Sequence, residues 1–314
     1  MPMHIVTPLT ESIPLGNMLN KNVYLKLECV QTAGSFKIRG IGKYCQELYD
    51  QGCRTFICPS SGNAGYATAW AARVLGAKAL IVAPEGTTQD AITAIQSLGG
   101  EVMVYGEVWD LSNIKAQELA KELPNAAYIT SYDHPSLWDG YGTMIDEIRQ
   151  QCPVKPDGIL LSVGGGGMMS GILQGLDRNG WSDVPVIGCG TYGANAFAET
   201  VKAGRHVKLD KTRTLVHCIS ATEVTSHIVD ELPGHNLLAH VTSDTSACIA
   251  CERFLDDHRL LVDPACGVTL SALYENSPLL KDMKNIVVII CGGVGITYRE
   301  LMETKAAAME KEAK

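Results

Sequence analysis

Short apolar runs that alternate with longer helical runs are the feature that most constrains the fold of this chain. Strands are predicted at residues 23–28, 55–58, 79–83, 102–105 and 127–129, and again at 158–163, 184–189 and 286–290. Helices are predicted over residues 41–51, 66–75, 89–98, 111–123, 143–151 and 244–258, with others beginning near 168, 264 and 298. A strand, a helix and a second strand at this spacing form a parallel pair joined by a crossover helix. We therefore predict an α/β fold with two open parallel sheets flanked by helices.

A stretch rich in Asp, His, Pro and Trp, residues 131–142, separates the two series of strands. We predict that it is a loop that carries the chain between two lobes, because 314 residues are enough for two domains. The predicted smaller domain spans residues 40–138, and the larger domain is made from residues 1–39 and 139–314.

The composition argues against several classes of protein. The chain is 46% hydrophobic and 19% charged, which is enough to bury a core, and its net charge of −8 argues against nucleic acid or an anionic membrane as the main partner. We expect neither a signal peptide in the first residues nor a membrane-spanning run. Eleven scattered cysteines without the spacing of a disulfide scaffold favour a reducing, cytoplasmic setting.

Four consecutive glycines, Gly164–Gly167, follow a predicted strand and precede a predicted helix. Backbone N–H groups at a helix start bind anions, and glycines let an anion approach the backbone closely. The run is not a P-loop, which would end in Gly-Lys-Ser/Thr, and it lacks the third glycine of the dinucleotide fingerprint. It therefore suits a single phosphate, with a flexible turn as the alternative.

Lys37 lies in residues 34–40 (GSFKIRG), between a predicted strand and a predicted helix. Most lysines are solvated surface charges, and that is the alternative here. Gly34 and Ser35 permit a sharp entry, and Phe36 supplies an apolar wall. A lysine buried beside a phosphate-bearing aldehyde would be suited to forming an imine.

Residues 60–65 (SSGNAG) form a polar loop that ends one predicted strand and opens the next helix. The N–H groups of this loop could bind a substrate carboxylate, and Asn63 could hydrogen-bond a phenolic oxygen. The alternative for Ser and Asn at this place is N-capping of the helix.

The other cysteines and the histidines carry no assigned chemistry. Cys291 ends a predicted buried strand and, taken alone, is an ordinary buried thiol. Cys248 and Cys251 form a C-x-x-C on one face of a helix without a zinc or redox context. No metal-ligand or general-base role is assigned to His4, His134, His206, His217, His227, His235, His240 or His258.

Five motifs together resemble the fold-type II pyridoxal-phosphate enzymes, a two-domain fold like that of the tryptophan synthase β-subunit, and among them the L-serine/L-threonine dehydratase group. In the family's order, and over nearly the whole chain, the motifs are residues 34–40 (GSFKIRG), 60–65 (SSGNAG), 162–167 (SVGGGG), 263–267 (DPACG) and 291–293 (CGG). Within this group the chain is most similar to animal serine dehydratases and serine dehydratase-like proteins, which share a cysteine at the position of Cys291.

The resemblance implies a role for each matching residue. Lys37 would hold pyridoxal phosphate as an imine and take the α-proton of the substrate, and Phe36 would pack against the cofactor ring. Asn63 would hydrogen-bond the 3′-oxygen of the ring, and Cys291 would face the pyridine nitrogen. The phosphate would be held by backbone N–H groups of Gly164, Gly165, Gly166, Gly167 and Met168. The carboxylate pocket would be lined by Ser60, Ser61, Asn63 and Ala64.

A thiol at the pyridine nitrogen affects the reaction that the resemblance implies. A thiol is a poor proton donor, so the nitrogen should stay largely unprotonated and the ring should be a weaker electron sink. Prompt loss of a β-hydroxyl, helped by the cofactor phosphate as acid, is then favoured over transamination. The products would be a 2-oxo acid and ammonia.

Several positions depart from the family pattern, and three of them bear on the chemistry. Gly190 stands where the family has a glutamate that helps to hold a monovalent or divalent cation, so we assign no metal ligand and leave cation binding open. Asp263 replaces a glutamate. Ser61 stands where animal serine dehydratases have Ala or Gly, whereas serine racemase and threonine dehydratases have Ser. Its hydroxyl could act as a second acid/base opposite Lys37, as racemisation needs, with N-capping as the alternative.

We therefore expect a pyridoxal-phosphate lyase that removes ammonia from L-serine or L-threonine. A racemase or β-replacement enzyme that uses the same site is one alternative, and a weakly active cofactor-binding regulator is another. The expected partner is a small amino-acid substrate, with no nucleic acid and no membrane. The resemblance alone implies a homodimer, and the preferred amino acid is left open.

Overall fold

The computed structural model describes residues 2–313, which divide into two compact units. Unit 1 comprises residues 2–5 and 30–141, and unit 2 comprises residues 6–29 and 142–313. The predicted domain boundaries follow residues 39 and 138 and so assign Lys37 to the larger domain. In the structure, Lys37 falls in unit 1, the smaller unit. That each unit is an independent domain remains a prediction.

Unit 1 contains four strands and four complete helices. The strands are β3 (Thr55–Cys58), β4 (Lys78–Ala83), β5 (Glu101–Val104) and β6 (Ala126–Tyr128), and the helices are α2 (Lys37–Asp50), α3 (Asn63–Leu75), α4 (Gln89–Ser97) and α5 (Trp109–Glu122). Helix α6 (Pro135–Gln151) begins in unit 1 and ends in unit 2.

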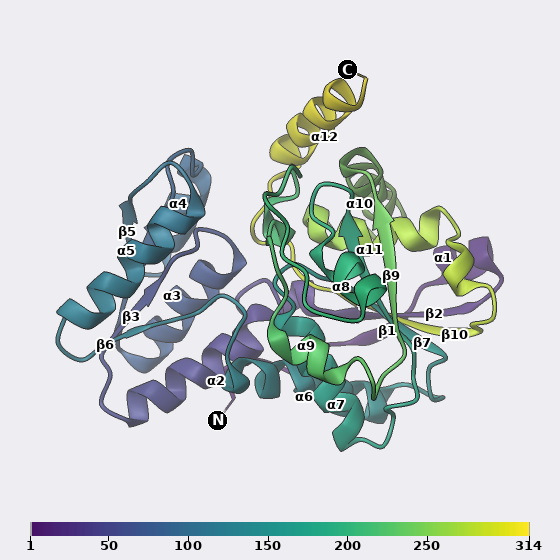
Figure 1. The fold of residues 1–314 in the computed structure, drawn as a ribbon, viewed down its shortest axis with the longest axis horizontal. Coiled ribbons are helices and arrows are strands. Elements are labelled where there is room, and N and C mark those ends of the chain that lie inside the picture. The colour runs from purple at the N-terminus through teal and green to yellow at the C-terminus, as the bar shows by residue number, and fades with distance from the viewer. Residues whose placement is uncertain (1, 314) are drawn as a thin grey trace. The chain divides into compact units, whose positions relative to one another are not determined.

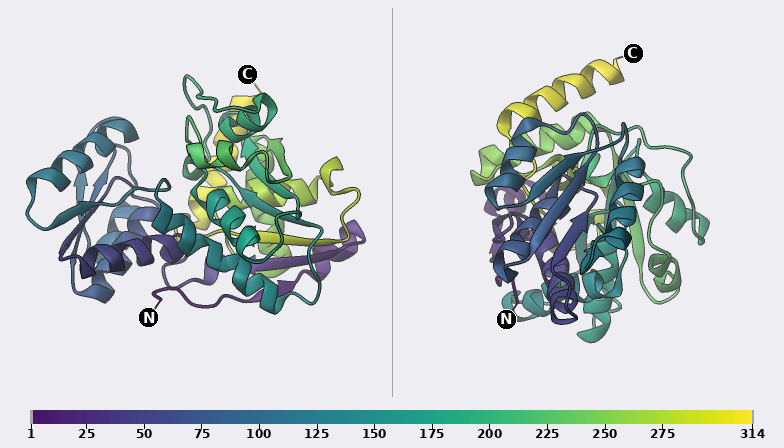
Figure 2. Two further views of the ribbon diagram at one scale, coloured as in Figure 1. Left: turned by 60° about the horizontal axis from the view of Figure 1, so that its bottom comes forward. Right: turned by 90° about the vertical axis from the view of Figure 1, so that its left-hand side faces the viewer.

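The four strands of unit 1 form a parallel sheet in the order β5-β4-β3-β6 (Figures 1 and 2). Helix α5 follows β5 and packs on the sheet, where Ala116 forms a core cluster with Ile57 and Val82. All three side chains are fully buried. Since parallel neighbours need a crossover, these helices are what the alternating sequence pattern predicts.

Unit 2 contains the larger sheet. Its strands are β1 (Leu9–Glu11), β2 (Asn22–Leu27), β7 (Gly158–Ser162), β8 (Val186–Thr191), β9 (Leu237–Thr242) and β10 (Asn285–Ile290). Its helices are α1 (Ile13–Leu19), α7 (Gly167–Arg178), α8 (Ala196–Ala203), α9 (Ser226–Glu231), α10 (Asp244–His258), α11 (Pro264–Tyr274) and α12 (Tyr298–Glu312). Three short 3-10 helices are η1 (Glu28–Val30), η2 (His217–Ile219) and η3 (Pro278–Leu280).

The six strands of unit 2 follow the order β1-β2-β10-β7-β8-β9, and every neighbouring pair is parallel except β1 with β2 (Figure 1). Every residue of β7 is buried, as is usual for a central strand covered on both faces. Strands β7 and β10 pair directly, so their carboxyl ends open at the same edge of the sheet. That edge carries both Gly164–Gly167 and Cys291.

Most predicted elements are confirmed, and the differences lie at short or irregular segments. The strand at 55–58 and the helix at 244–258 have the predicted bounds, and Ser243 is the N-cap of the latter, accepting a hydrogen bond from Ser246 N at 3.0 Å. The loop predicted over 131–142 is wrong in its second half, because α6 begins at Pro135. Proline is tolerated in the first turn of a helix. The short elements β1, α1, α8, α9 and β9 were not predicted.

Within residues 2–313, no helix combines the length and the apolar character needed to cross a membrane.

Candidate active site

Lys37 is the first residue of α2 and is half-buried. Gly34, at φ +66°, turns the chain into the helix, and Phe36 occupies the N-cap position without a side-chain capping bond. The Lys37 ammonium donates a hydrogen bond to the Ser131 carbonyl oxygen at 2.5 Å and lies 5.2 Å from the centre of the Phe36 ring. This is a positioned lysine, not the freely solvated surface charge that was the alternative.

The surroundings of Lys37 are apolar and tightly packed. Phe36 meets the fully buried ring of Tyr141 edge-on, with 4.9 Å between the ring centres. A Cβ added at Gly40 would lie 2.6 Å from the Tyr141 ring, so this helix face has no spare room. Burial raises the pKa of Cys58 to about 11, and the charge of Lys37 acts in the opposite direction. Lys37 therefore acts electrostatically on the end of β3, from which the next loop emerges.

The loop of residues 60–62 leads into α3, whose N-cap is Gly62, without a side-chain capping bond. The N-cap alternative for Ser61 and Asn63 is therefore wrong. The loop folds back so closely that a Cβ on Gly65 would lie 1.7 Å from the Ser60 carbonyl oxygen. The first helical bond runs from Tyr66 N to Gly62 O at 3.0 Å. The N–H groups of the first turn therefore have no acceptor within the helix, as an anion site requires.

Ser61 is half-buried, and its hydroxyl lies 3.2 Å from Thr87 Oγ1. Thr87 Oγ1 donates to the Pro84 carbonyl oxygen at 2.8 Å, so Ser61 is the donor in the contact with Thr87. Ser60 and Asn63 are also half-buried, and Ala64 is buried.

In unit 2, the glycine run forms the turn between β7 and α7. Gly166, at φ +90°, is the N-cap of α7 and makes no side-chain capping bond. A Cβ at Gly164 would lie 2.9 Å from Ile219 Cα, and one at Gly166 would lie 2.4 Å from Ile228 Cδ1. The run is therefore pinned by packing, because neither position has room for a side chain.

The donors of this turn are arranged for a phosphate. The first helical bond of α7 runs from Ser170 N to Gly166 O at 2.9 Å, so the N–H groups of Gly167, Met168 and Met169 have no acceptor within the helix. They add to the positive end of the helix dipole. The glycine backbone leaves them open to a single phosphate, which is what the sequence predicts.

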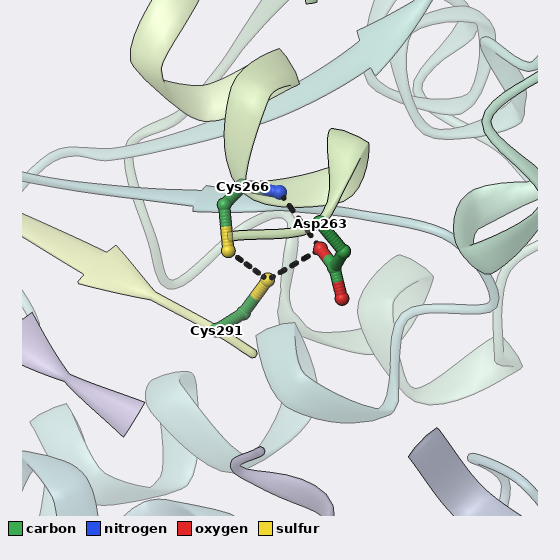
Figure 3. A group of neighbouring side chains, drawn as sticks. All are labelled: Asp263, Cys266 and Cys291. Carbon is green, nitrogen blue, oxygen red and sulfur yellow. Dashed lines mark hydrogen bonds between the residues drawn. The ribbon is translucent and has the colours of Figure 1, made fainter. Parts of the chain in front are cut away.

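Cys291 follows β10 and belongs to a buried group with Asp263 and Cys266 (Figure 3). The two sulfur atoms are 3.1 Å apart, and Asp263 Oδ1 lies 4.0 Å from the Cys291 sulfur. Asp263 is the N-cap of α11 and accepts a hydrogen bond from Cys266 N at 3.2 Å. From β7, the Ser162 hydroxyl donates to the Cys291 sulfur at 3.6 Å.

The thiols around Cys291 are neutral near pH 7. Burial raises the pKa of Cys266 well above its usual value, and its hydrogen bond with Cys291 adds to the rise. Burial also raises the pKa of Cys29 to about 12. Sequence reasoning missed Cys266 and Ser162 as neighbours of Cys291, although both lie within the recognised motifs.

Gly190 lies in β8 and supplies no carboxylate, and a Cβ there would already be 3.0 Å from the Ala194 carbonyl oxygen. The residues at this position do not fit the cation site that the resemblance implies.

Comparison with known proteins defines the class. The family described as pyridoxal-phosphate dependent enzyme matches residues 1–292. The chain belongs to this family, so the predicted cofactor is confirmed. The pinned glycine turn and its open N–H groups fit the phosphate of that cofactor.

The similar proteins have more specific names. The mouse protein called serine dehydratase-like is 40% identical over 312 residues, which cover 97% of this chain and 94% of the relative. The human L-serine dehydratase/L-threonine deaminase is 39% identical over 312 residues, covering 97% and 95%. The crystal structure of a fungal L-serine ammonia-lyase from Rhizomucor miehei matches with a TM-score of 0.93 and 33% identity, over 98% of this chain and 100% of that chain. The predicted family resemblance and fold class are confirmed.

Proposed function

We propose that the protein is an ammonia-lyase that converts L-serine, L-threonine or both to a 2-oxo acid and ammonia. The observation that carries this proposal is the pinned glycine turn at the start of α7, which is suited to a cofactor phosphate. The positioned Lys37 at the start of α2 supports it. Relatives about 40% identical over nearly the whole chain bear dehydratase and deaminase names.

The cofactor, when bound, supplies an electron sink that stabilises negative charge at the substrate α-carbon. The protein residues hold it in place. N–H groups from Gly164 to Met168 would bind the phosphate, and Phe36 would pack against the ring. Asn63 would hydrogen-bond the 3′-oxygen, and Cys291 would face the ring nitrogen. A thiol is a poor proton donor, so it would leave that nitrogen largely unprotonated, which favours elimination over transamination.

Lys37 is the covalent anchor and the base that removes the α-proton. Both tasks need a neutral amine at some point in the cycle. The start of α2 assists, because the positive end of a helix dipole disfavours a second positive charge there. Phe36 keeps one side of the amine apolar.

The substrate carboxylate binds to the N–H groups at the start of α3, with Ser60, Ser61 and Ala64 lining the pocket. Ser61 also supports a second candidate function, that of a racemase or a β-replacement enzyme, because a hydroxyl on this half-buried loop could deliver a proton. Chiral analysis of serine during turnover separates the two. D-Serine that forms faster than pyruvate would overturn the lyase proposal.

The decisive assay measures ammonia and 2-oxo acid release from a panel of L-amino acids, with and without potassium or magnesium. We expect L-serine or L-threonine to be the best substrate, and Lys37→Ala to lose both turnover and the bound-cofactor absorbance. Lys43→Ala is the matched control, because Lys43 lies on the same helix but is exposed and ion-paired with Asp139. Cofactor binding without turnover on any amino acid would favour the weakly active regulator instead. Resemblance further supports a cytoplasmic homodimer, which sedimentation and cell fractionation would test.

A further inference from the structure

A second group of chemically capable side chains lies in unit 2, outside the motifs of the candidate active site. Asp177 is near the end of α7, His227 and Glu231 lie one turn apart on α9, and His235 follows before β9. The three α9-side residues are spaced four apart in the sequence (HIVDELPGH, residues 227–235). Sequence reasoning gave these histidines no role, because Asp177 is 50 positions away in the chain from the nearest of them.

The imidazole of His235 meets several carboxylate oxygens at similar distances. Its Nε2 lies 3.2 Å from Asp177 Oδ1, 3.4 Å from Asp177 Oδ2 and 3.3 Å from Glu231 Oε2. The Nε2 of His227 lies 3.6 Å from Glu231 Oε1. Charge-assisted N–H···O bonds are shorter, about 2.7–2.9 Å, and one N–H can be aimed well at only one oxygen. These contacts are therefore not ordinary short ion pairs.

The same distances match the edges of a metal coordination tetrahedron. The edge of a tetrahedron is about 1.63 times the metal–ligand bond, so zinc bonds of about 2.0–2.2 Å place ligand atoms about 3.3–3.6 Å apart. The separations around His235 Nε2 run from 3.2 to 3.4 Å, and one ligand atom from each of Asp177, Glu231 and His235 lies within 4.8 Å of the other two. We propose that Asp177, Glu231 and His235 form a binding site for a divalent transition-metal ion of the Zn²⁺ type, with the fourth position open to water.

The donor set selects the class of metal. An imidazole nitrogen with carboxylate oxygens suits Zn²⁺, Ni²⁺ or Cu²⁺, whereas Mg²⁺ and Ca²⁺ prefer oxygen ligands alone. The His235 side chain is 1% exposed and Asp177 is 47% exposed, so the site is buried on one side and reachable from the other. The Nδ1 of His235 has no hydrogen-bond partner among residues 2–313. The Nε2 is therefore the ring nitrogen that faces the carboxylates and would bind the ion.

A neighbouring polar group orients one of the ligands. The Ser182 hydroxyl donates to Asp177 Oδ1 at 2.6 Å, as outer hydrogen bonds do in metal sites.

A bound ion would tie the segment around α9 to α7. Thr225, at the start of that segment, donates its N–H to the Gly165 carbonyl oxygen at 2.9 Å, and Ile228 packs against Gly166. The ion would thus restrain the segment that pins the glycine turn. The site itself does not depend on the proposed lyase activity, because metal binding is measured without substrate.

The test titrates the cofactor-loaded protein, first treated with chelator, with Zn²⁺ and separately with Co²⁺. We expect one ion per chain, a visible Co²⁺ spectrum of tetrahedral intensity, and no thiolate charge-transfer band in the near ultraviolet. Glu231→Gln and the exposed Asp177→Asn should each weaken Zn²⁺ binding by at least about tenfold. His206→Asn is the matched control, because His206 Nε2 lies 3.7 Å from Glu223 but belongs to no such group, and its Zn²⁺ affinity should match that of the parent protein.

Three results would overturn the proposal. Equal Zn²⁺ affinity in the parent protein and in both ligand variants would place the ion elsewhere. A strong thiolate band with Co²⁺ would assign it to cysteines such as Cys266 and Cys291. No binding at all would mean that the three side chains form ion pairs only. Circular dichroism of each variant confirms that a lost site is not a lost fold.

Discussion

Replacing Gly166 with alanine tests whether the glycine turn is a built phosphate site. The added Cβ would lie 2.4 Å from Ile228 Cδ1 and 3.2 Å from Thr225 Cγ2, at a φ of +90°. The left-handed backbone costs an alanine about 1–2 kcal/mol. Overpacking against the fully buried Ile228 adds about 1–3 kcal/mol. If the turn moves to relieve that contact, the N–H groups leave the phosphate, and cofactor affinity should fall about 5- to 150-fold, since about 1.4 kcal/mol is tenfold.

Gly180→Ala provides the control for backbone strain alone. Gly180 lies just beyond α7 at φ +67°, and a Cβ there meets nothing within 4 Å. We expect Gly180→Ala to lose about 1–2 kcal/mol of unfolding free energy and to bind the cofactor normally. Urea unfolding of the cofactor-free proteins gives the first quantity, and fluorescence titration with pyridoxal phosphate gives the second. The reasoning is refuted if both variants bind the cofactor equally well.

Three further predictions concern stability and substrate binding. Lys26→Met removes the ion-pair partner of the buried Glu147 carboxylate, which lies 2.5 Å from the Lys26 ammonium. The unfolding free energy measured in urea should therefore fall by about 3–5 kcal/mol, and adding Glu147→Met should restore most of that loss. Gly62→Asp should cap α3 and so raise the melting temperature slightly. The new carboxylate would occupy the N–H groups that the substrate carboxylate needs, so the KM for the amino acid should rise. Gly62→Ala, whose Cβ has room, should leave KM unchanged. Burial lowers the pKa of His258, so the folded state resists its protonation. The stability that neutral His258 contributes is complete above the unfolded pKa of about 6.5 and is lost as the pH falls through the lower folded pKa. His258→Gln should abolish this pH dependence, which urea midpoints measured from about pH 8 to 5 would show.

The strands and long helices could be predicted because their signal is local. A buried parallel strand such as β7 is a continuous apolar run, and α10 carries both a helical period and a capping serine at its start. The start of α6 escaped prediction because Asp133, His134 and Pro135 are typical of a loop, although proline fits the first turn of a helix. Short elements such as α9, with six residues, hold too few residues for a period to be recognised.

The chemistry of the candidate site was predictable where a motif is contiguous, and not where contacts join distant segments. The glycine run and the loop at residues 60–65 each predict a helix start, because the residues that indicate it are contiguous in the sequence. The pairing of Cys266 with Cys291, 25 positions apart, depends on α11 packing beside β10. The approach of Asp177 to His235, 58 positions apart, depends in the same way on α7 and α9 lying together. No periodicity encodes such contacts, because they are set by the packing of whole elements.

The way helices begin in this protein distinguishes the proposed binding sites from structural helix ends. Helices with no assigned ligand start with a side-chain cap at Thr88, Ser243 and Thr297. Helices α3 and α7 start instead at Gly62 and Gly166, which bond none of the first-turn N–H groups. A side-chain cap would occupy the donors that a carboxylate or a phosphate needs. Glycine leaves these donors open and costs only about a few tenths of a kcal/mol of helix stability relative to a capping residue. Helices α5 and α8 also lack a side-chain cap, but Val108 and Asn195 stand at their starts, so a missing cap alone does not mark a site. The mark is a glycine N-cap directly after the carboxyl end of a parallel strand, where the chain turns tightly and the helix dipole faces outward.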